Sequence, residues 1–446
     1  MKKPFAFFLP AACLLLLILP SARLAWSSRD MPQLGHFHDD GMYWVTAQSL
    51  ALGSGYRILS LPGTPAAGKY PPLFPLYLSI AWRASPSFPG NSPWLALLTW
   101  LPYPALVALS WRFLSKLLPD LLPRVLACVM LALSPTTVAL SILALSHLMF
   151  CVLLLASLIL AEKVLAENVS WPVIALAGII GAAAYLTRTA ALPLLISVPA
   201  VFVLKRRYRA AFLFLAFMSP AVIGWMTWSA RNRVPSSDPT LAYYTDYMGY
   251  YFQMMSVHVF PVVLKTNIIQ FFASVGDVFV NGIDGRFLGL PPGLVPAVIS
   301  FLGIVKLVRR GFVLQYAAFS VLYILMLVVW HYQPTDSVVL PIFPLLLAGF
   351  FTQLWDIGRK MARLRPRLTA AAAIALFVFV GYRNADTIGR TLPAFIEDQR
   401  RITRSNLLAF RWIDQHTPPN ALFLARYDAL LYLYTGRRAC WMFTIR

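Results

Sequence analysis

Apolar runs about as long as a lipid bilayer is thick recur along this chain, and they constrain its fold more than any other feature. A helix that crosses the hydrocarbon core needs about 20 mostly apolar residues. About eleven runs approach that length, near residues 5–26, 93–113, 124–143, 145–161, 171–186, 190–204, 210–230, 292–305, 312–330, 338–355 and 369–382. Because unpaired backbone groups are costly in lipid, each run is expected to be helical. The sequence therefore predicts an all-α polytopic membrane protein.

The balance of charges supports lipid as the main solvent. Only 12% of the 446 residues are charged, which is about half the share found in soluble domains. The net charge of +21 would suggest nucleic-acid binding in a soluble protein. Here the basic residues cluster between apolar runs, as they do in cytoplasmic loops. Membrane lipids are therefore the expected partners, and nucleic acid is not.

The basic clusters also predict the orientation of the chain. With the N-terminus inside, the chain returns to the cytoplasm after the sixth, eighth and tenth runs, and basic clusters follow these runs at 205–209, 306–310 and 359–367. The turn at 331–337, after the ninth run, has no lysine or arginine. The positive-inside rule thus predicts a cytoplasmic N-terminus and an extracytoplasmic C-terminus. The expected location is a cell membrane of the bacterial inner-membrane type. The first run lacks a small-residue cleavage site and is predicted to be an uncleaved span.

This orientation divides the chain into two predicted parts. Residues 1–383 form a membrane module with two long outside loops, at 27–92 and 231–291. Residues 384–446 form a small extracytoplasmic segment, in which an amphipathic stretch at 407–413 precedes short strand or helix pieces at 422–424 and 430–434. The four cysteines, at positions 13, 128, 151 and 440, show neither zinc-ligand spacing nor a disulfide framework.

An acidic pair in the first outside loop is the strongest candidate for chemistry. Asp39 and Asp40 are adjacent in a chain with only 17 acidic residues. Two carboxylates held close have split pKa values, so one stays a base near neutral pH. Glycosyl transfer needs such a base to take a proton from the acceptor, and a carboxylate also stabilises the cationic transition state. Alternatively, either residue could cap a helix over 41–52, and the two roles are compatible.

Two further features of the outside loops each allow two interpretations. With His36 and His38, the acidic pair could bind a divalent metal, although the spacing follows no specific rule, and no cofactor is assigned. Lys69 and Tyr70 precede two prolines that stiffen the loop, and a lysine at the membrane surface suits a lipid phosphate or simply snorkels to the interface.

A tyrosine-rich stretch marks the second outside loop. It is typical of a helix in the aromatic belt at the membrane interface, and acceptor binding is the alternative. Its tyrosines are Tyr243, Tyr244, Tyr247, Tyr250 and Tyr251.

Together these motifs resemble the first loop of the GT-C type glycosyltransferases. The resemblance is to the group of protein O-mannosyltransferases, lipid A aminoarabinose transferases and lipopolysaccharide-core sugar transferases. Members carry an acidic pair followed by a tyrosine, a helix of small residues and a Lys-Tyr-Pro-Pro step. In this chain these features are Asp39, Asp40 and Tyr43, then residues 47–55, then residues 69–72.

Weaker similarities extend the resemblance over most of the chain. Arg188, at the outer end of the fifth run, matches an arginine that the group often carries there. Pro341 and Pro344 are similar to its late proline-containing span, and residues 432–438 are similar to its C-terminal region. The resemblance implies a GT-C-like bundle with extracytoplasmic loop helices and a small C-terminal extracytoplasmic segment.

The resemblance also implies roles for individual residues. Asp39 is the expected catalytic base, with Asp40 supporting it or positioning the acceptor. Lys69, Tyr70 and Arg188 are expected to hold the phosphate of a polyprenyl-phosphate-linked sugar donor. The remaining expected positions, which orient the substrate, are Tyr43 and His38. A buried arginine at the membrane boundary is usually functional, and interfacial snorkelling is the alternative for Arg188. The acceptor would be a glycan, a lipid or a protein outside the cytoplasm.

The chain departs from the group in three places. It has Ser146-His147 where members often have Ser-Glu, and Asp336-Ser337 where they often have an arginine. Its C-terminal segment is shorter than usual, which fits a minimal or incomplete C-terminus. A transporter or flippase of lipid-linked saccharides is the main alternative function, but such proteins tend to show repeated halves, and no repeat stands out here. A non-catalytic scaffold with the same fold is a third interpretation.

Overall fold

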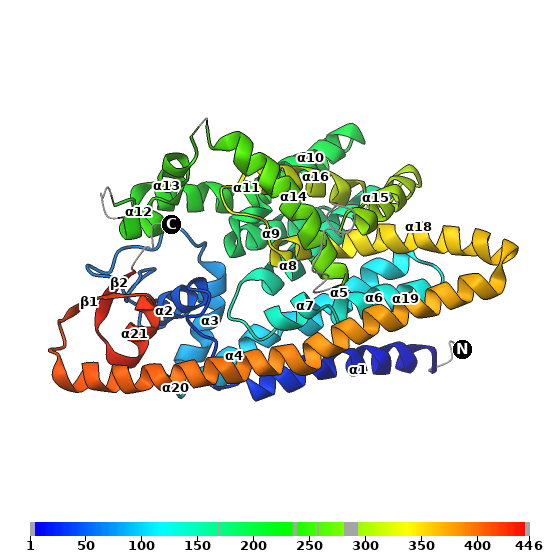
Figure 1. Ribbon diagram of the computed structural model, residues 1–446. Helices are drawn as coiled ribbons and strands as arrows, with labels where there is room; N and C mark the ends of the chain where they lie inside the picture. Colours follow the sequence, from blue (N-terminus) through cyan, green and yellow to red (C-terminus); the bar gives the residue numbers. More distant parts are fainter. Residues whose placement is uncertain (1–4, 168–169, 235–238, 257, 281–292, 442–446) are drawn as a thin grey trace.

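The computed structural model describes residues 5–167, 170–234, 239–256, 258–280 and 293–441, and almost all of its regular structure is helical (Figure 1). In the first half of the chain the helices are α1 (Phe5–Ser27), α2 (Asp39–Ala51), α3 (Leu73–Ala84), α4 (Ser92–Trp100), α5 (Pro102–Leu117), α6 (Leu121–Ala132), α7 (Pro135–Leu140), α8 (His147–Ala166), α9 (Trp171–Thr187), η1 (Thr189–Ala191), α10 (Leu194–Leu204) and α11 (Tyr208–Arg231).

The second half adds further helices and one small sheet. The helices are α12 (Pro239–Thr245), α13 (Tyr247–Met254), α14 (Phe260–Phe279), α15 (Leu294–Arg309), α16 (Leu314–Val329), α17 (Asp336–Val339), η2 (Leu340–Ile342), α18 (Phe343–Leu364), α19 (Pro366–Asp386), η3 (Thr387–Thr391), α20 (Leu392–His416) and α21 (Asp428–Thr435). Strands β1 (Leu422–Ala425) and β2 (Arg438–Trp441) pair in parallel, with Leu422 opposite Arg438.

Within the described residues each predicted apolar run is covered mainly by one or more helices, which confirms an all-α polytopic membrane fold. Six helical runs of the described chain are long and apolar enough to cross a membrane: Ser92–Leu117, His147–Ala166, Tyr208–Arg231, Phe260–Phe279, Asp336–Leu364 and Pro366–His416. Shorter apolar helices lie at Leu14–Ser27, Leu121–Ala132, Trp171–Thr187, Thr189–Leu204 and Leu314–Val329. The run at 124–143 is interrupted before Pro135, because proline lacks the N–H that a continuous helix needs.

One helix lies where the sequence predicts only an outside loop. Helix α14 has 20 residues within the predicted loop 231–291. Two of its hydrogen bonds run to the end of α16 and to the segment after it: Asn267 Nδ2 donates to Val328 O at 3.2 Å, and Ser274 Oγ donates to Pro334 O at 2.9 Å. These contacts place the middle of α14 beside the C-terminal end of α16 and the segment that follows it.

The predicted boundary at residue 383 falls inside a helix. Helix α19 does not end there but continues through the π-helical turn η3 into α20, so that residues 366–416 form one helical run of 51 residues. The amphipathic stretch at 407–413 belongs to α20, and the predicted pieces at 422–424 and 430–434 are β1 and α21. The C-terminal segment is therefore joined rigidly to the last apolar helix.

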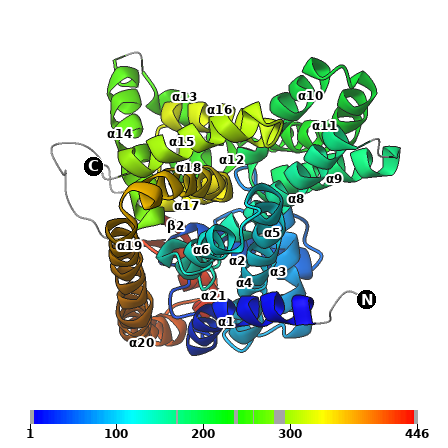
Figure 2. The ribbon, with the colours of Figure 1, turned by 90° about the vertical axis from the view of Figure 1, so that its right-hand side faces the viewer.

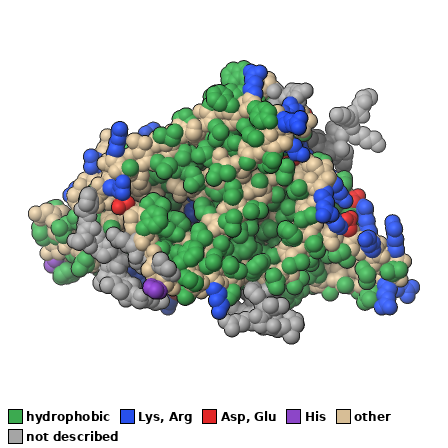
Figure 3. All heavy atoms as spheres, turned by 90° about the horizontal axis from the view of Figure 1, so that it is seen from above, with side chains coloured by type: hydrophobic (Ala, Val, Ile, Leu, Met, Phe, Trp, Pro, Cys, Tyr) green, Lys and Arg blue, Asp and Glu red, His purple; other side chains and the backbone are tan. Residues whose placement is uncertain are grey.

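The two ends of the molecule differ in their elements. In Figure 1, helices α2, α3 and α21 and both strands gather at one end, and the N-terminus and the turn between α18 and α19 lie at the other. Figure 2 looks along the molecule from that second end and shows α19 and α20 at one side of the bundle. Figure 3 shows a broad apolar surface with basic side chains gathered toward its margins, as expected of a lipid-facing wall.

Candidate active site

The first outside loop enters α2 through a tight turn at His38. This residue has φ 62° and ψ −50° and makes no capping bond with its side chain. The N–H of Asp39 donates to Phe37 O at 2.6 Å across the turn. Helix α2 begins at Asp39, so the two aspartates lie in its first turn, after the N-cap position. Negative charge is favoured there by the helix dipole.

Asp40 faces the protein interior. Its carboxylate is buried and accepts from Gly35 N at 3.0 Å and Gly41 N at 2.6 Å. Burial, with a smaller contribution from the charge of Asp39, raises the pKa of Asp40 to about 7 although these backbone N–H groups oppose the rise. Asp40 therefore ties down the backbone of the loop, and its oxygens are already engaged.

Asp39 points the other way and remains accessible. Its side chain is 38% exposed, and Oδ1 lies 3.7 Å from Lys69 Nζ. Tyr70 donates its hydroxyl proton to the same oxygen, and Lys69 Nζ donates to the Tyr70 hydroxyl at 2.7 Å. The predicted base thus lies beside two of the predicted phosphate-binding residues.

Lys69 is enclosed by aromatic rings as well as by Asp39. Its side chain is 8% exposed, and Nζ lies 3.5 Å from the centroid of the Tyr243 ring and 5.1 Å from that of Tyr247. Burial lowers the pKa of Lys69 to about 8, although the charge of Asp39 opposes the fall and that of Arg188 adds to it. The ammonium is therefore a desolvated charge that is well placed to attract an anion.

Arg188 and Tyr43 meet at a serine. Ser146 Oγ accepts from Arg188 Nη1 at 3.0 Å and lies 3.0 Å from the Tyr43 hydroxyl. The ring of Tyr43 packs against that of Tyr70, with centroids 4.9 Å apart. Arg188 follows the end of α9 and is thereby connected to the loop that holds Asp39. Ser146 is therefore the link between Arg188 and Tyr43.

The tyrosine-rich stretch covers the site. Helices α12 and α13 carry its tyrosines, and Gly68 allows α12 to approach: the Gly68 N–H donates to Tyr244 O at 3.2 Å, and a Cβ on Gly68 would lie 2.8 Å from Thr245 O. Ser229 Oγ, at the end of α11, donates to Gly68 O at 3.0 Å. Three of these tyrosines, Tyr243, Tyr244 and Tyr247, have their rings near Lys69 Nζ.

A residue that the sequence did not single out reaches the site from the C-terminal segment. Asp428 is buried, and its Oδ1 lies 2.9 Å from His38 Nε2. The Tyr244 hydroxyl lies 2.7 Å from His38 Nδ1. The signal in the sequence is slight: one acidic residue at the start of a short apolar stretch.

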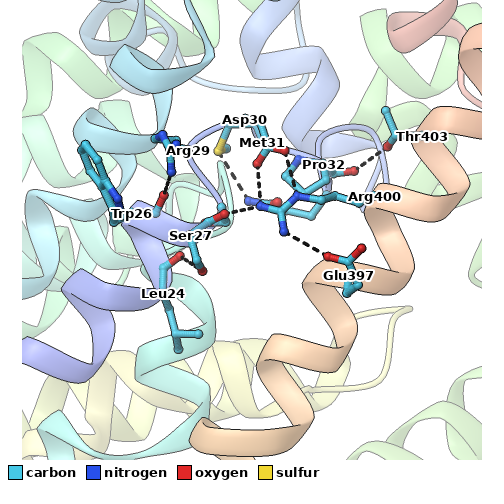
Figure 4. A network of polar contacts seen from close by, with 12 residues as sticks. Leu24, Trp26, Ser27, Arg29, Asp30, Met31, Pro32, Glu397, Arg400 and Thr403 are labelled. Atoms are coloured by element: carbon cyan, nitrogen blue, oxygen red, sulfur yellow. Dashed lines mark hydrogen bonds and ion pairs between the residues drawn. The ribbon is translucent and has the colours of Figure 1, made fainter.

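A second polar link fastens the C-terminal segment to the same loop (Figure 4). Arg400, on α20, donates to both oxygens of Asp30, at 2.9 and 3.0 Å, and also to Ser27 O. Thr403 Oγ1 donates to Pro32 O at 2.9 Å. The end of α1 and the start of the loop are thus held to α20 at two successive turns.

The four residues considered as metal ligands turn to different partners. His36 packs against Phe37 and Phe395, while His38 contacts Asp428 and Asp40 contacts backbone N–H groups. Across the described residues, no three side chains of His, Cys, Asp or Glu come together as a metal site. The Asp39 carboxylate instead contacts Lys69 and the Tyr70 hydroxyl, whereas Arg188 is linked to Tyr43 through Ser146.

Comparison with known proteins places the fold. No protein-family model matches the chain, and no curated protein sequence matches it. Among solved structures, ArnT from Cupriavidus metallidurans bound to undecaprenyl phosphate is similar, with a TM-score of 0.54 and 12% identity over 97% of this chain and 86% of that one.

An archaeal protein has a similar structure. The oligosaccharyltransferase AglB from Archaeoglobus fulgidus, in complex with an inhibitory peptide and a dolichol-phosphate, matches with a TM-score of 0.51 and 13% identity over 98% of this chain. The apo form of the oligosaccharyltransferase from this archaeon matches with a TM-score of 0.54. This chain spans 65% of the length of the archaeal protein.

Proposed function

With a GT-C-type fold as the premise, we propose that this chain is a glycosyltransferase that moves a sugar from a polyprenyl-phosphate donor to an acceptor outside the cytoplasm. The observation that supports this most is the accessible carboxylate of Asp39, 3.7 Å from a buried lysine ammonium. A lipid phosphate and an acceptor hydroxyl or amine need these two groups side by side. Two of the similar structures were determined with a lipid phosphate bound, undecaprenyl phosphate in one and a dolichol-phosphate in the other.

In the proposed reaction, Asp39 acts as general base. The acceptor oxygen or nitrogen attacks the anomeric carbon while Asp39 takes its proton. The bond from that carbon to the phosphate oxygen breaks, and polyprenyl phosphate leaves with the bonding electron pair. Lys69 and Arg188 stabilise the negative charge of the leaving phosphate. The attack occurs opposite the leaving group, so the anomeric configuration inverts.

Other predicted residues support this chemistry. Tyr70 donates its proton to Asp39 and accepts from Lys69, so its hydroxyl fixes the distance between base and phosphate site. Tyr43 would orient the substrate from the adjacent Ser146 contact. The site would face the extracytoplasmic side of a cell membrane, as the charge rule predicts.

An activity assay with an Asp39→Asn variant tests the proposal. Purified protein in lipid nanodiscs is given undecaprenyl-phosphate-linked hexose, pentose and aminopentose, with an envelope lipid and glycan extract as acceptor. Release of undecaprenyl phosphate is followed by mass spectrometry. Asn cannot accept the proton, so we expect turnover with one of these donors to fall by about 100-fold or more, the range typical of general-base catalysis.

The matched control is Asp30→Asn. Asp30 lies in the same loop but contacts Arg400 on α20 rather than the site. We expect this variant to keep the turnover of the unmodified protein. Unchanged turnover in Asp39→Asn, with normal membrane insertion of both variants, would remove Asp39 as the base and the proposed function with it.

A further inference from the structure

Asp428 and His38 form a buried pair that joins the C-terminal segment to the loop of Asp39. The side chain of Asp428 is completely buried, and that of His38 is 13% exposed. Asp428 Oδ1 lies 2.9 Å from His38 Nε2, and Oδ2 has no hydrogen-bond partner within the described part of the chain. Burying a carboxylate costs free energy unless the carboxylate is paired. The contact with His38 therefore offsets the free-energy cost of burying Asp428.

The backbone of His38 adopts a conformation that non-glycine residues avoid. Its φ of 62° and ψ of −50°, with the hydrogen bond from Asp39 N to Phe37 O at 2.6 Å, define a γ-turn of positive φ. This form of the turn is rare and strained. Such a conformation persists only where the surrounding structure fixes it, and it is most often found at functional sites.

The surrounding residues fix this backbone conformation by holding the side chain of His38. Asp428 contacts Nε2, the Tyr244 hydroxyl lies 2.7 Å from Nδ1 and 2.8 Å from Nε2, and the Tyr244 ring stacks on the imidazole with centroids 5.6 Å apart. Asp39 follows directly, so the turn sets the direction in which the Asp39 side chain leaves the backbone. A change at His38 therefore reaches Asp39 through one peptide unit.

We propose that Asp428 is a positioning residue for glycosyl transfer: through His38 it holds the strained turn that aims Asp39 at the donor. This proposal rests on the function proposed above. The residue acts from 390 positions along the chain, so the C-terminal segment completes the catalytic loop in addition to packing beside it.

Docking of the C-terminal segment does not depend on this pair alone. Ala439 N, on β2, donates to Ser60 O at 2.9 Å, and a Cβ on Gly41 would lie 2.9 Å from Ala429 Cβ, which shows how closely α2 and α21 pack. Arg400 adds its contacts with Asp30. We therefore expect an Asp428→Asn variant to fold with the segment in place.

The first experiment compares Asp428→Asn with Asp30→Asn, using full-length protein in nanodiscs and the donor that the unmodified protein turns over. A misplaced catalytic group can lower the rate by about 100-fold, so we expect the kcat of Asp428→Asn to fall by about 10- to 100-fold. The KM for the donor, the affinity for undecaprenyl phosphate and the melting temperature should stay near their original values. Asp428→Glu should recover part of the lost kcat, and Asp30→Asn should lose none.

Two results would overturn the proposal. One is an unchanged kcat in Asp428→Asn. The other is an equal loss of kcat, phosphate affinity and melting temperature in Asp428→Asn and Asp30→Asn, because that pattern reports loosened docking. If Asp39→Asn is inactive while Asp428→Asn is fully active, only this inference fails. If Asp39→Asn is active, the proposed function fails first.

A second experiment tests the route through the turn. Glycine adopts positive φ without strain, whereas alanine does not. We expect His38→Gly to retain more turnover than His38→Ala, and Asp428→Asn to have little further effect in the His38→Gly background. If Asp428→Asn lowers kcat equally with and without the His38 side chain, Asp428 does not act through His38, and the proposal is wrong.

Discussion

Lys69 lies between the Asp39 carboxylate and the ring of Tyr243, where water has little access. Burial is the main reason that its pKa falls from the ordinary value of 10.5 to about 8. The ammonium is therefore present below about pH 8 and is lost as the pH rises through that value. A phosphate that depends on this charge should be held less tightly in alkaline solution.

This dependence gives a testable prediction. We expect the affinity of the protein for undecaprenyl phosphate to fall as the pH rises through about 8, measured by titration in nanodiscs. In Lys69→Arg the guanidinium stays charged, so the fall near pH 8 should disappear even if the affinity at neutral pH is lower. An affinity in the unmodified protein that is constant across this range would contradict a role for the Lys69 charge.

Short motifs predicted the residues around Asp39 because each motif lies within one loop. Lys69 and Tyr70 are neighbours in sequence, and the structure brings them to Asp39. Asp40, which was expected to support Asp39 or to position the acceptor, faces the interior because consecutive residues of a helix do not face each other, and its role stays a prediction. Asp428 was not predicted because its contact spans 390 positions, and a single sequence carries no pattern that links two such residues.

At the scale of elements, the apolar runs predicted the positions of the helices well. They predicted less well where one helix ends and the next begins. Helix α14 was missed because Lys265, Asn267 and Gln270 interrupt its apolar residues. The structure shows that Asn267 is buried and donates to carbonyls at the end of α16. In the sequence, polar residues that hydrogen-bond to the end of a neighbouring helix look like loop residues.

The crossing of α15 and α18 depends on two glycines. A Cβ on Gly303 would collide with Gly349 O, and one on Gly349 would collide with Ser300 O. Small residues let helix backbones approach closely in this way. We expect Gly349→Ala to lower the free energy of unfolding by about 1–3 kcal/mol through overpacking, measured as a lower melting temperature in nanodiscs.

Gly358 on the same helix is the matched control for that substitution. A Cβ there meets no atom within 4 Å. Alanine is the better helix former, so Gly358→Ala should leave the melting temperature unchanged or slightly higher. Equal melting temperatures for the two variants would show that the close approach of α15 and α18 contributes little to stability.

At the scale of the whole molecule, we expect the basic clusters and the Asp39 site to lie on opposite sides of the membrane. The turn between α18 and α19 belongs to a basic cluster that the charge rule assigns to the cytoplasm, and the loop of Asp39 lies at the other end (Figure 1). The basic clusters between the apolar runs predict this polarity, which stays a prediction. The sequence did not predict that α19 and α20 would continue as one helical run of 51 residues.

Labelling of single cysteines tests the orientation. In a background without the four native cysteines, Arg57→Cys lies in the first outside loop and Arg365→Cys in the basic turn, and both native side chains are exposed. A membrane-impermeant maleimide should label the first variant in intact cells and the second only after lysis. Labelling of Arg365→Cys in intact cells would reverse the orientation and put Asp39 in the cytoplasm.

The contact between α21 and the first loop has a consequence for how the protein is made. If Asp428 braces the turn before Asp39 as proposed, the brace is synthesised 390 residues after His38, the residue that it contacts. A nascent chain therefore carries Asp39 on an unbraced loop until residue 428 has been made. Products that stop before that residue would lack the contact and should be poor catalysts of the proposed transfer.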